Sequence, residues 1–200
     1  MFKKTARLTA VIAGLALAGT SAHANLLVNG GFETYEPGVQ WAGDFADPNG
    51  DWTNTLTGSG VNSFVSSLYQ DGPVLGLGNS LYVWSGYATV DQDVSTAWTA
   101  SDTIDIGLIA ADPWGGGNDY VTVALRDTSN NVLWSDTVTD MPSTATQYNW
   151  SVDASTLGVA DGTDLNLAIT GHDRAFIDNA SLALAVPEPS SLALLGLGGL

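Results

Sequence analysis

The sequence predicts an all-β protein built as an antiparallel β-sandwich. After residue 25, apolar and polar side chains alternate at every second position through most of the chain. Turn-forming residues separate these segments, and the 3.6-residue periodicity of helices is nearly absent. Alternation is typical of a strand with one buried face and one solvent face. Short strands at this spacing favour two packed sheets.

The expected strands follow one another along the chain, each with apolar side chains on one face. A short apolar segment, Leu26 to Val28, predicts the first strand, and the segment 176–182 predicts the last. Between them, alternating segments run from Ile104 to Leu108, Val121 to Leu125, Val132 to Val138, Tyr148 to Val152 and Leu165 to Ile169.

Turn chemistry separates these strands. Asp127 to Asn131 predicts a hairpin connection, and Asp161 to Thr163 predicts a turn, because Asp, Asn, Ser and Gly favour such backbones. Pro113 to Asp119 is rich in glycine and predicts an open loop, while residues 38–60 and 72–78 are the other loop-rich parts.

The N-terminus has the organisation of a signal peptide. Lys3, Lys4 and Arg7 precede an apolar stretch, and Ala22-His23-Ala24 has the A-x-A form of a cleavage site. A retained membrane anchor is disfavoured because the apolar run is too short to span a bilayer. We therefore expect residues 1–24 to form a signal helix that signal peptidase removes during export, leaving a mature protein that begins at Asn25.

The C-terminus carries Pro187-Glu188-Pro189, followed at once by a leucine-rich run of small residues. The two prolines hold the glutamate in an extended, solvated backbone, which is accessible to a processing enzyme. Residues 186–200 resemble the PEP-CTERM sorting signal. The resemblance implies recognition by an exosortase and a destination at the cell surface or extracellular matrix of a Gram-negative bacterium. The alternative interpretation is a floppy apolar tail.

This segment departs from the PEP-CTERM pattern in length. Only eleven residues follow Pro189, and no arginine cluster is among them. At about 1.5 Å per residue an apolar helical tail of this length reaches about 16 Å, roughly half a bilayer core. We expect a truncated or decayed signal, with only transient membrane contact through the two ends.

Charge excludes one class of function. Five basic residues against 21 acidic ones give a net charge of −16. After export only Arg126 and Arg174 remain against the same 21 acidic residues, which gives −19. Such a chain repels nucleic acids and anionic membrane surfaces, so we expect no nucleic-acid partner. It attracts cations, Ca²⁺ among them.

The sequence gives little support to catalysis. It has no cysteine, which excludes disulfides, thiol nucleophiles and cysteine-bound metals. His172 is the only histidine after the signal peptide, and no G-x-S-x-G, H-E-x-x-H or Walker A pattern is present. Carboxylate pairs such as Asp91 and Asp93 suit glycoside hydrolysis only when held across a cleft. We therefore predict that the protein is not an enzyme.

The two ends of the 25–185 domain carry a second resemblance. If the last strand is regular, Asp178 points inward, and a buried carboxylate needs a partner such as an arginine or Ca²⁺. An Asn29-x-Gly31-Phe32-Glu33 entry and an Ile177-Asp178-Asn179-x-Ser181-Leu182 exit resemble galactose-binding-like β-sandwiches, the jelly-roll fold of many carbohydrate-binding modules. The resemblance implies neighbouring first and last strands and a structural Ca²⁺ held by Glu33 and Asp178. A capping role for Glu33 and a hydrogen-bonded edge position for Asp178 are the alternatives.

Tryptophans are the other candidate site, because aromatic faces stack on the C–H surfaces of sugars. Trp114 lies among glycines on a loop and is the first candidate for glycan binding, and Trp52 is the second. Trp134 and Trp150 lie on alternating strand faces and fit the core better. The acidic stretch from Asp44 to Asp51 is interpreted as a solvated turn, because it lacks the glycine and the terminal glutamate of a calcium loop.

The sequence thus predicts an exported, non-catalytic surface or matrix protein with a β-sandwich for adhesion or glycan binding, with a polysaccharide as its partner. Two alternatives remain open, a glycan-active hydrolase and a structural matrix protein with no small ligand.

Overall fold

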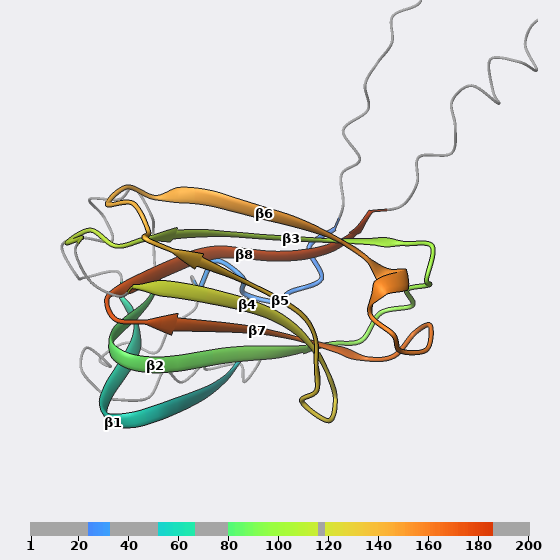
Figure 1. The fold of residues 1–200 in the computed structure, drawn as a ribbon, viewed down its shortest axis with the longest axis horizontal. Helices are drawn as coiled ribbons and strands as arrows, with labels where there is room; N and C mark the ends of the chain where they lie inside the picture. Colours follow the sequence, from blue (N-terminus) through green and yellow to red (C-terminus); the bar gives the residue numbers. More distant parts are fainter. Residues whose placement is uncertain (1–23, 33–51, 67–79, 116–118, 186–200) are drawn as a thin grey trace, which may run out of the picture.

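The computed structural model describes residues 24–32, 52–66, 80–115 and 119–185, which form a β-sandwich (Figure 1). The all-β, antiparallel prediction is confirmed. The only helix in these ranges is a 3-10 turn, η1, at Ala154–Thr156. The strands are β1 Thr53–Ser66, β2 Ser80–Val94, β3 Thr103–Ala111, β4 Tyr120–Asp127, β5 Val132–Thr139, β6 Thr146–Asp153, β7 Leu165–His172 and β8 Ala175–Ala185.

Strand β2 joins the two sheets. The strand order is β5-β4-β7-β2-β8-β3-β6, and every pairing is antiparallel. Residues 87–94 of β2 pair with β7, whereas residues 81–83 pair with β8. We call β5-β4-β7-β2 the first sheet and β2-β8-β3-β6 the second sheet. β1 lies along the other edge of β2.

The transition in β2 occurs at Gly86, whose φ of 73° favours glycine. The β7–β8 turn fixes this point. The Gly86 amide donates to Asp173 Oδ1 at 3.1 Å, and the Asp173 amide donates to the Gly86 carbonyl at 3.3 Å. The bend in β2 and the β7–β8 turn are therefore one hydrogen-bonded unit.

The core lies between the inner faces of the two sheets, as the alternation predicts. Ile104 and Leu108 of β3, Val123 of β4 and Leu167 of β7 are fully buried in it. Trp134 of β5 and Trp150 of β6 pack against this core with ring centroids 6.3 Å apart, and the Trp150 indole N–H donates to Asp136 at 2.6 Å. These edge contacts close one side of the sandwich. Within the described part of the chain, no helix is long and apolar enough to cross a membrane.

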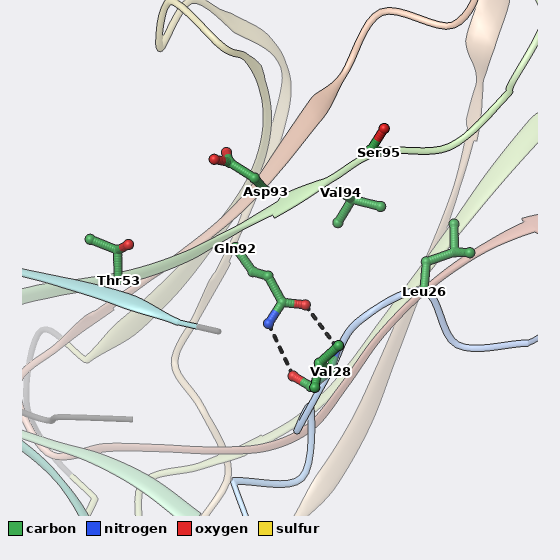
Figure 2. Close-up of a pocket in the computed structure, with 7 residues that line it drawn as sticks. All are labelled: Leu26, Val28, Thr53, Gln92, Asp93, Val94 and Ser95. Carbon is green, nitrogen blue, oxygen red and sulfur yellow. Dashed lines mark hydrogen bonds between the residues drawn. The ribbon is translucent and has the colours of Figure 1, made fainter. Parts of the chain in front are cut away.

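The expected first strand at Leu26 to Val28 does not form a strand, but the segment does lie beside β8. The Leu26 amide donates to the Leu182 carbonyl, and the Ala180 amide donates to the Gly30 carbonyl, both at 2.8 Å. On its other side, Val28 is held by a side chain rather than a strand. Gln92 donates to its carbonyl at 3.0 Å and accepts from its amide at 2.8 Å (Figure 2).

A β-bulge corrects the predicted orientation of Asp178. The register of β8 against β3 shifts near Asn179, whose φ is 48°. One extra residue moves the following side chains to the other face of the sheet. Ile177, Ala180 and Leu182 belong to the core, so Asp178 lies on the face opposite to Ile177. Asp178 is nevertheless 2% exposed.

Gly30→Ala is expected to destabilise the protein by about 3 kcal/mol, at the upper end of the cost of overpacking. A Cβ at this position would lie 2.0 Å from the Ala180 carbonyl oxygen, which is backbone and cannot move aside without disturbing β8. Thermal unfolding measures the effect. Gly158→Ala is the comparison, because its Cβ meets no atom within 4 Å and only its φ of 72° is strained. Equal losses of stability in the two variants would contradict the clash.

Candidate functional site

The solvent face of the first sheet gathers polar and aromatic side chains in regular rows. Since Val121, Val123 and Leu125 of β4 face the core, the alternate residues face outward, and the same holds for β7 and β2. The strand register aligns these outward residues across the sheet. The four rows, each read from β2 through β7 to β4, are Tyr87-His172-Tyr120, Thr89-Thr170-Thr122, Asp91-Ala168-Ala124 and Asp93-Asn166-Arg126.

The first row is aromatic. The ring of His172 lies 4.4 Å from that of Tyr87 and 4.7 Å from that of Tyr120, and it stacks on Tyr120 with an interplanar angle of 11°. The rings of Tyr87 and Tyr120 are 6.2 Å apart. Tyr87 is 43% exposed. We call these three residues the aromatic row. Its exposed ring is that of Tyr87, whereas the His172 side chain is 14% exposed.

The pKa of Tyr120 is raised to about 12, mainly because the phenol is buried. The hydrogen bond with Tyr87, the charge of Tyr87 and the charge of Asp173 raise it further. The phenol therefore stays neutral at physiological pH. A neutral phenol keeps its capacity both to donate and to accept a hydrogen bond.

We expect the Tyr120 phenol to titrate at about 12, above the ordinary value of 10.0. A raised folded pKa stabilises the fold fully below the unfolded pKa, and this stabilisation is lost as the pH rises through the folded pKa. Ultraviolet titration of phenolate absorbance in the natural protein and in Tyr120→Phe measures it. The transition near 12 should vanish in the variant. A phenolate curve unchanged by Tyr120→Phe near pH 12 would refute the assignment.

A groove lies beyond the threonine row. The hydroxyls of Thr89 and Thr170 are 2.8 Å apart. The groove has a volume of about 450 Å³ and opens beside Thr89. Its lining residues come from β1, β2, β4 and the β4–β5 turn: Thr53, Thr55, Thr89, Asp91, Arg126 and Asn130. The aromatic row and this groove thus occupy the same face of the first sheet.

Asn166 organises the polar end of this face. It is 4% exposed, and its Nδ2 donates to Asp91 Oδ2 at 2.8 Å and to Asp93 Oδ1 at 2.9 Å. The two carboxylates are successive outward residues of one strand and share one amide. They therefore lie side by side on the sheet and do not face each other across a cleft.

A second cavity of about 350 Å³ lies around Gln92 (Figure 2). Leu26 and Val28 line it from the N-terminal segment, and Thr53 lines both this cavity and the groove. Both polar groups of the Gln92 amide are occupied by the Val28 backbone. We assign this cavity a structural role, because its central polar side chain holds the N-terminal segment.

Trp52, a predicted glycan-binding residue, lies in the core. It is 4% exposed, packs 5.3 Å from Phe32, and donates its indole N–H to the Val28 carbonyl at 2.9 Å. In this position its ring offers no face to a sugar. The sequence could not show this, because its partners lie twenty or more residues away.

Trp114 lies on the surface, as its place among glycines predicted. It is 41% exposed and packs against Tyr82 and Phe176 at 5.6 and 5.7 Å. Its amide donates to Asp112 Oδ1 at 3.1 Å. Its exposed ring thus keeps it as a candidate for ligand contact, separate from the aromatic row.

Of the predicted metal and sorting residues, the structure describes only Asp178. Asp178 Oδ1 accepts a hydrogen bond from the Asn179 amide at 2.7 Å. Glu33 and the sorting residues Pro187, Glu188 and Pro189 lie outside the described residues, as does the signal peptide up to residue 23. Among the described residues, no group of three potential ligands surrounds a metal position.

Comparison with known proteins identifies the fold. No protein-family model and no curated protein matches the sequence. Among solved structures, the chain is similar to TmCBM61 in complex with β-1,4-galactotriose, with a TM-score of 0.53 and 16% identity over 80% of this chain and 97% of that one. A Stig cyclase from Fischerella sp. TAU gives a TM-score of 0.61 and 17% identity, covering 84% and 100% of the two chains.

An arabinose-bound GH51 α-L-arabinofuranosidase gives a TM-score of 0.56 and 18% identity over 83% of this chain. The chain spans only 27% of that enzyme's length. At these identities the comparisons establish the fold alone. It is the jelly-roll β-sandwich found in carbohydrate-binding modules.

Proposed function

We propose that this protein is an exported, non-catalytic glycan-binding module of the cell surface or extracellular matrix. The observation that carries the proposal is the aromatic row of Tyr87, His172 and Tyr120 on the same open sheet face as a polar groove. Sugars present apolar C–H faces edged by hydroxyls. Aromatic rings stack on those faces, and a few polar groups fix the hydroxyls.

The fold similarity supports this proposal. The TmCBM61 structure holds β-1,4-galactotriose and the arabinofuranosidase structure holds arabinose. The spacing of the two ends of the site also favours an extended ligand. Tyr120 and Arg126 are six residues apart on β4, or about 20 Å at 3.3 Å per residue. A ligand that contacts both ends is therefore an oligosaccharide or polysaccharide.

The arrangement of the carboxylates favours binding over hydrolysis. Glycoside hydrolysis needs an acid and a base or nucleophile on opposite sides of the scissile bond. Asp91 and Asp93 lie on one strand and share the Asn166 amide. His172 is 3.7 Å from Asp173 and is stacked in the aromatic row, where it serves as a contact surface.

The proposal includes a structural Ca²⁺ held by Asp178 and Glu33. Carboxylate oxygens are suitable ligands for Ca²⁺. Asp178 is 2% exposed and lies next to the segment that ends at Phe32. A bound Ca²⁺ would tie the N-terminal segment to β8. Trp114 is kept as a second point of glycan contact.

A binding panel tests the function. Affinity electrophoresis in gels containing β-1,4-galactan, arabinan or xylan should retard the protein in at least one gel. No reducing ends should be released from that polysaccharide during long incubation. Release of reducing ends would support the alternative of a hydrolase. Unaltered migration in every gel would support the alternative of a structural matrix protein with no small ligand.

Processing at both ends is expected during export. Signal peptidase should cut after Ala24, and an exosortase should cut near Pro189, because Pro187 and Pro189 hold an extended, accessible backbone. Intact mass measurement of the exported native protein tests both cuts. Recovery of full-length chains from the membrane fraction would count against the sorting proposal.

A further inference from the structure

The polar end of the sheet face holds a donor and an acceptor that have no hydrogen-bond partners. Arg126 of β4 and Asn166 of β7 are register partners, so their side chains start from neighbouring positions. Arg126 Nε and Asn166 Oδ1 are both shielded from solvent and make no hydrogen bond. A buried donor or acceptor without a hydrogen-bond partner is unfavourable, and a ligand that satisfies both groups would remove this cost.

The orientation of the Asn166 amide follows from its neighbours. Its NH₂ group donates to both Asp91 and Asp93, and carboxylates only accept. The carbonyl oxygen Oδ1 of Asn166 is therefore the atom that lacks a hydrogen bond, and it can only accept one from a donor. Arg126 needs an acceptor at Nε, yet it forms no ion pair with the residues that the structure describes.

The Arg126 side chain lines the groove. A sugar hydroxyl satisfies both sites, because it donates one hydrogen bond and accepts others. A carboxylate accepts from Arg126 but leaves Asn166 Oδ1 without a donor, and it is repelled by Asp91 and Asp93. An ammonium group donates to Asn166 but is repelled by Arg126.

We propose that Arg126, which lines the groove, and Asn166, its register partner on β7, form a hydroxyl-binding subsite that selects neutral polysaccharides over uronic-acid polymers. This inference rests on the proposed glycan-binding function and adds the chemical class of the ligand. The charge of the whole chain acts in the same direction, since a net charge of −16 repels polyanions.

The test compares matched polymers and matched arginine variants. The probes are β-1,4-galactan, arabinan and xylan, each also as a carboxymethyl derivative and as a hydroxyethyl derivative of equal substitution. The Arg126→Lys variant keeps the positive charge but lacks Nε–H. Arg174→Lys makes the same replacement at an arginine that lies 3.7 Å from Asp119. Thermal unfolding confirms that both variants are folded.

We expect the carboxymethyl derivative of the bound polymer to bind about tenfold more weakly than the hydroxyethyl derivative. Arg126→Lys should weaken binding of the neutral polymer by about tenfold, the effect of losing about one hydrogen bond. Arg174→Lys should bind as the natural protein does. Unchanged binding by Arg126→Lys, or tighter binding of the carboxymethyl polymer, would overturn the subsite and leave the glycan-binding function intact. A natural protein that binds none of the polymers would overturn both.

Discussion

Replacing both Tyr87 and Tyr120 with alanine is expected to weaken polysaccharide binding by about a hundredfold or more. Aromatic side chains that become buried by a ligand contribute about 2 kcal/mol or more each, and a factor of ten corresponds to about 1.4 kcal/mol. The two rings flank His172, so their losses need not add. Isothermal titration with the polysaccharide that binds the natural protein measures the effect.

The control is Trp114→Ala, because Trp114 has the same exposure as Tyr87 but packs on Tyr82 and Phe176. It should lose much less affinity than the double variant. The reverse order, with a large loss at Trp114 and little at the two tyrosines, would move the binding site to the loop. Thermal unfolding of each variant separates lost contacts from lost folding.

Calcium is expected to raise the melting temperature by roughly 5–10 °C. A ligand that binds only the folded state adds about 2.7 kcal/mol at a hundredfold excess over its Kd. For a domain of this size, each kcal/mol corresponds to about 2–4 °C. The physical basis is the proposed link between Asp178 and Glu33, in a chain that has no disulfide to supply stability.

Thermal unfolding with Ca²⁺ and with chelator, at equal ionic strength, measures this shift without general charge screening. Asp178→Ala and Glu33→Ala should each remove the difference between the two conditions. Asp105→Ala is the matched control, since Asp105 lies on β3 and binds Ser151 at 2.6 Å. Equal melting temperatures for the natural protein in Ca²⁺ and chelator would exclude the metal and assign the stability of Asp178 to protein contacts.

Strands β3 to β8 could be predicted because their signal is local. β1 and β2 were not expected, and residues 53–60 of β1 fall within the segment 38–60 that was interpreted as loop-rich. Ile104 to Leu108 and Leu165 to Ile169 alternate regularly, and each lies within a strand whose inward side chains are buried. The first strand was expected at Leu26 to Val28 on the same grounds. This segment instead takes its hydrogen bonds from the Gln92 side chain and from β8, a long-range arrangement that no local pattern indicates.

The alternation of inward and outward side chains also fails to predict orientation where a β-bulge interrupts the strand. Asp178 was predicted to point inward, which holds only for an uninterrupted strand. The left-handed backbone of Asn179 inserts the extra residue, and asparagine tolerates this conformation better than most residues do. The only indication of the bulge in the sequence was that residue 179 is an asparagine, and this indication is weak by itself.

The candidate site was missed because it depends on register. Tyr87, Tyr120 and His172 come from three strands that are distant in the sequence, and their alignment follows from the pairing of β7 with both β2 and β4. No spacing motif links them. The sequence singled out tryptophans instead, since these have the largest aromatic surface. It ranked the exposed Trp114 first but also kept the buried Trp52 as a candidate.

Nuclear magnetic resonance can show directly whether a glycan binds on the face of the first sheet. The isotopically labelled protein would be titrated with a neutral oligosaccharide derived from the polymer that binds. We expect the resonances of Tyr87, Tyr120, Thr89 and Thr170 to shift together and saturate at one concentration, with the Arg126 Nε–H signal among them. Shifts confined to Trp114 and its loop, with the face of the first sheet unchanged, would contradict this expectation.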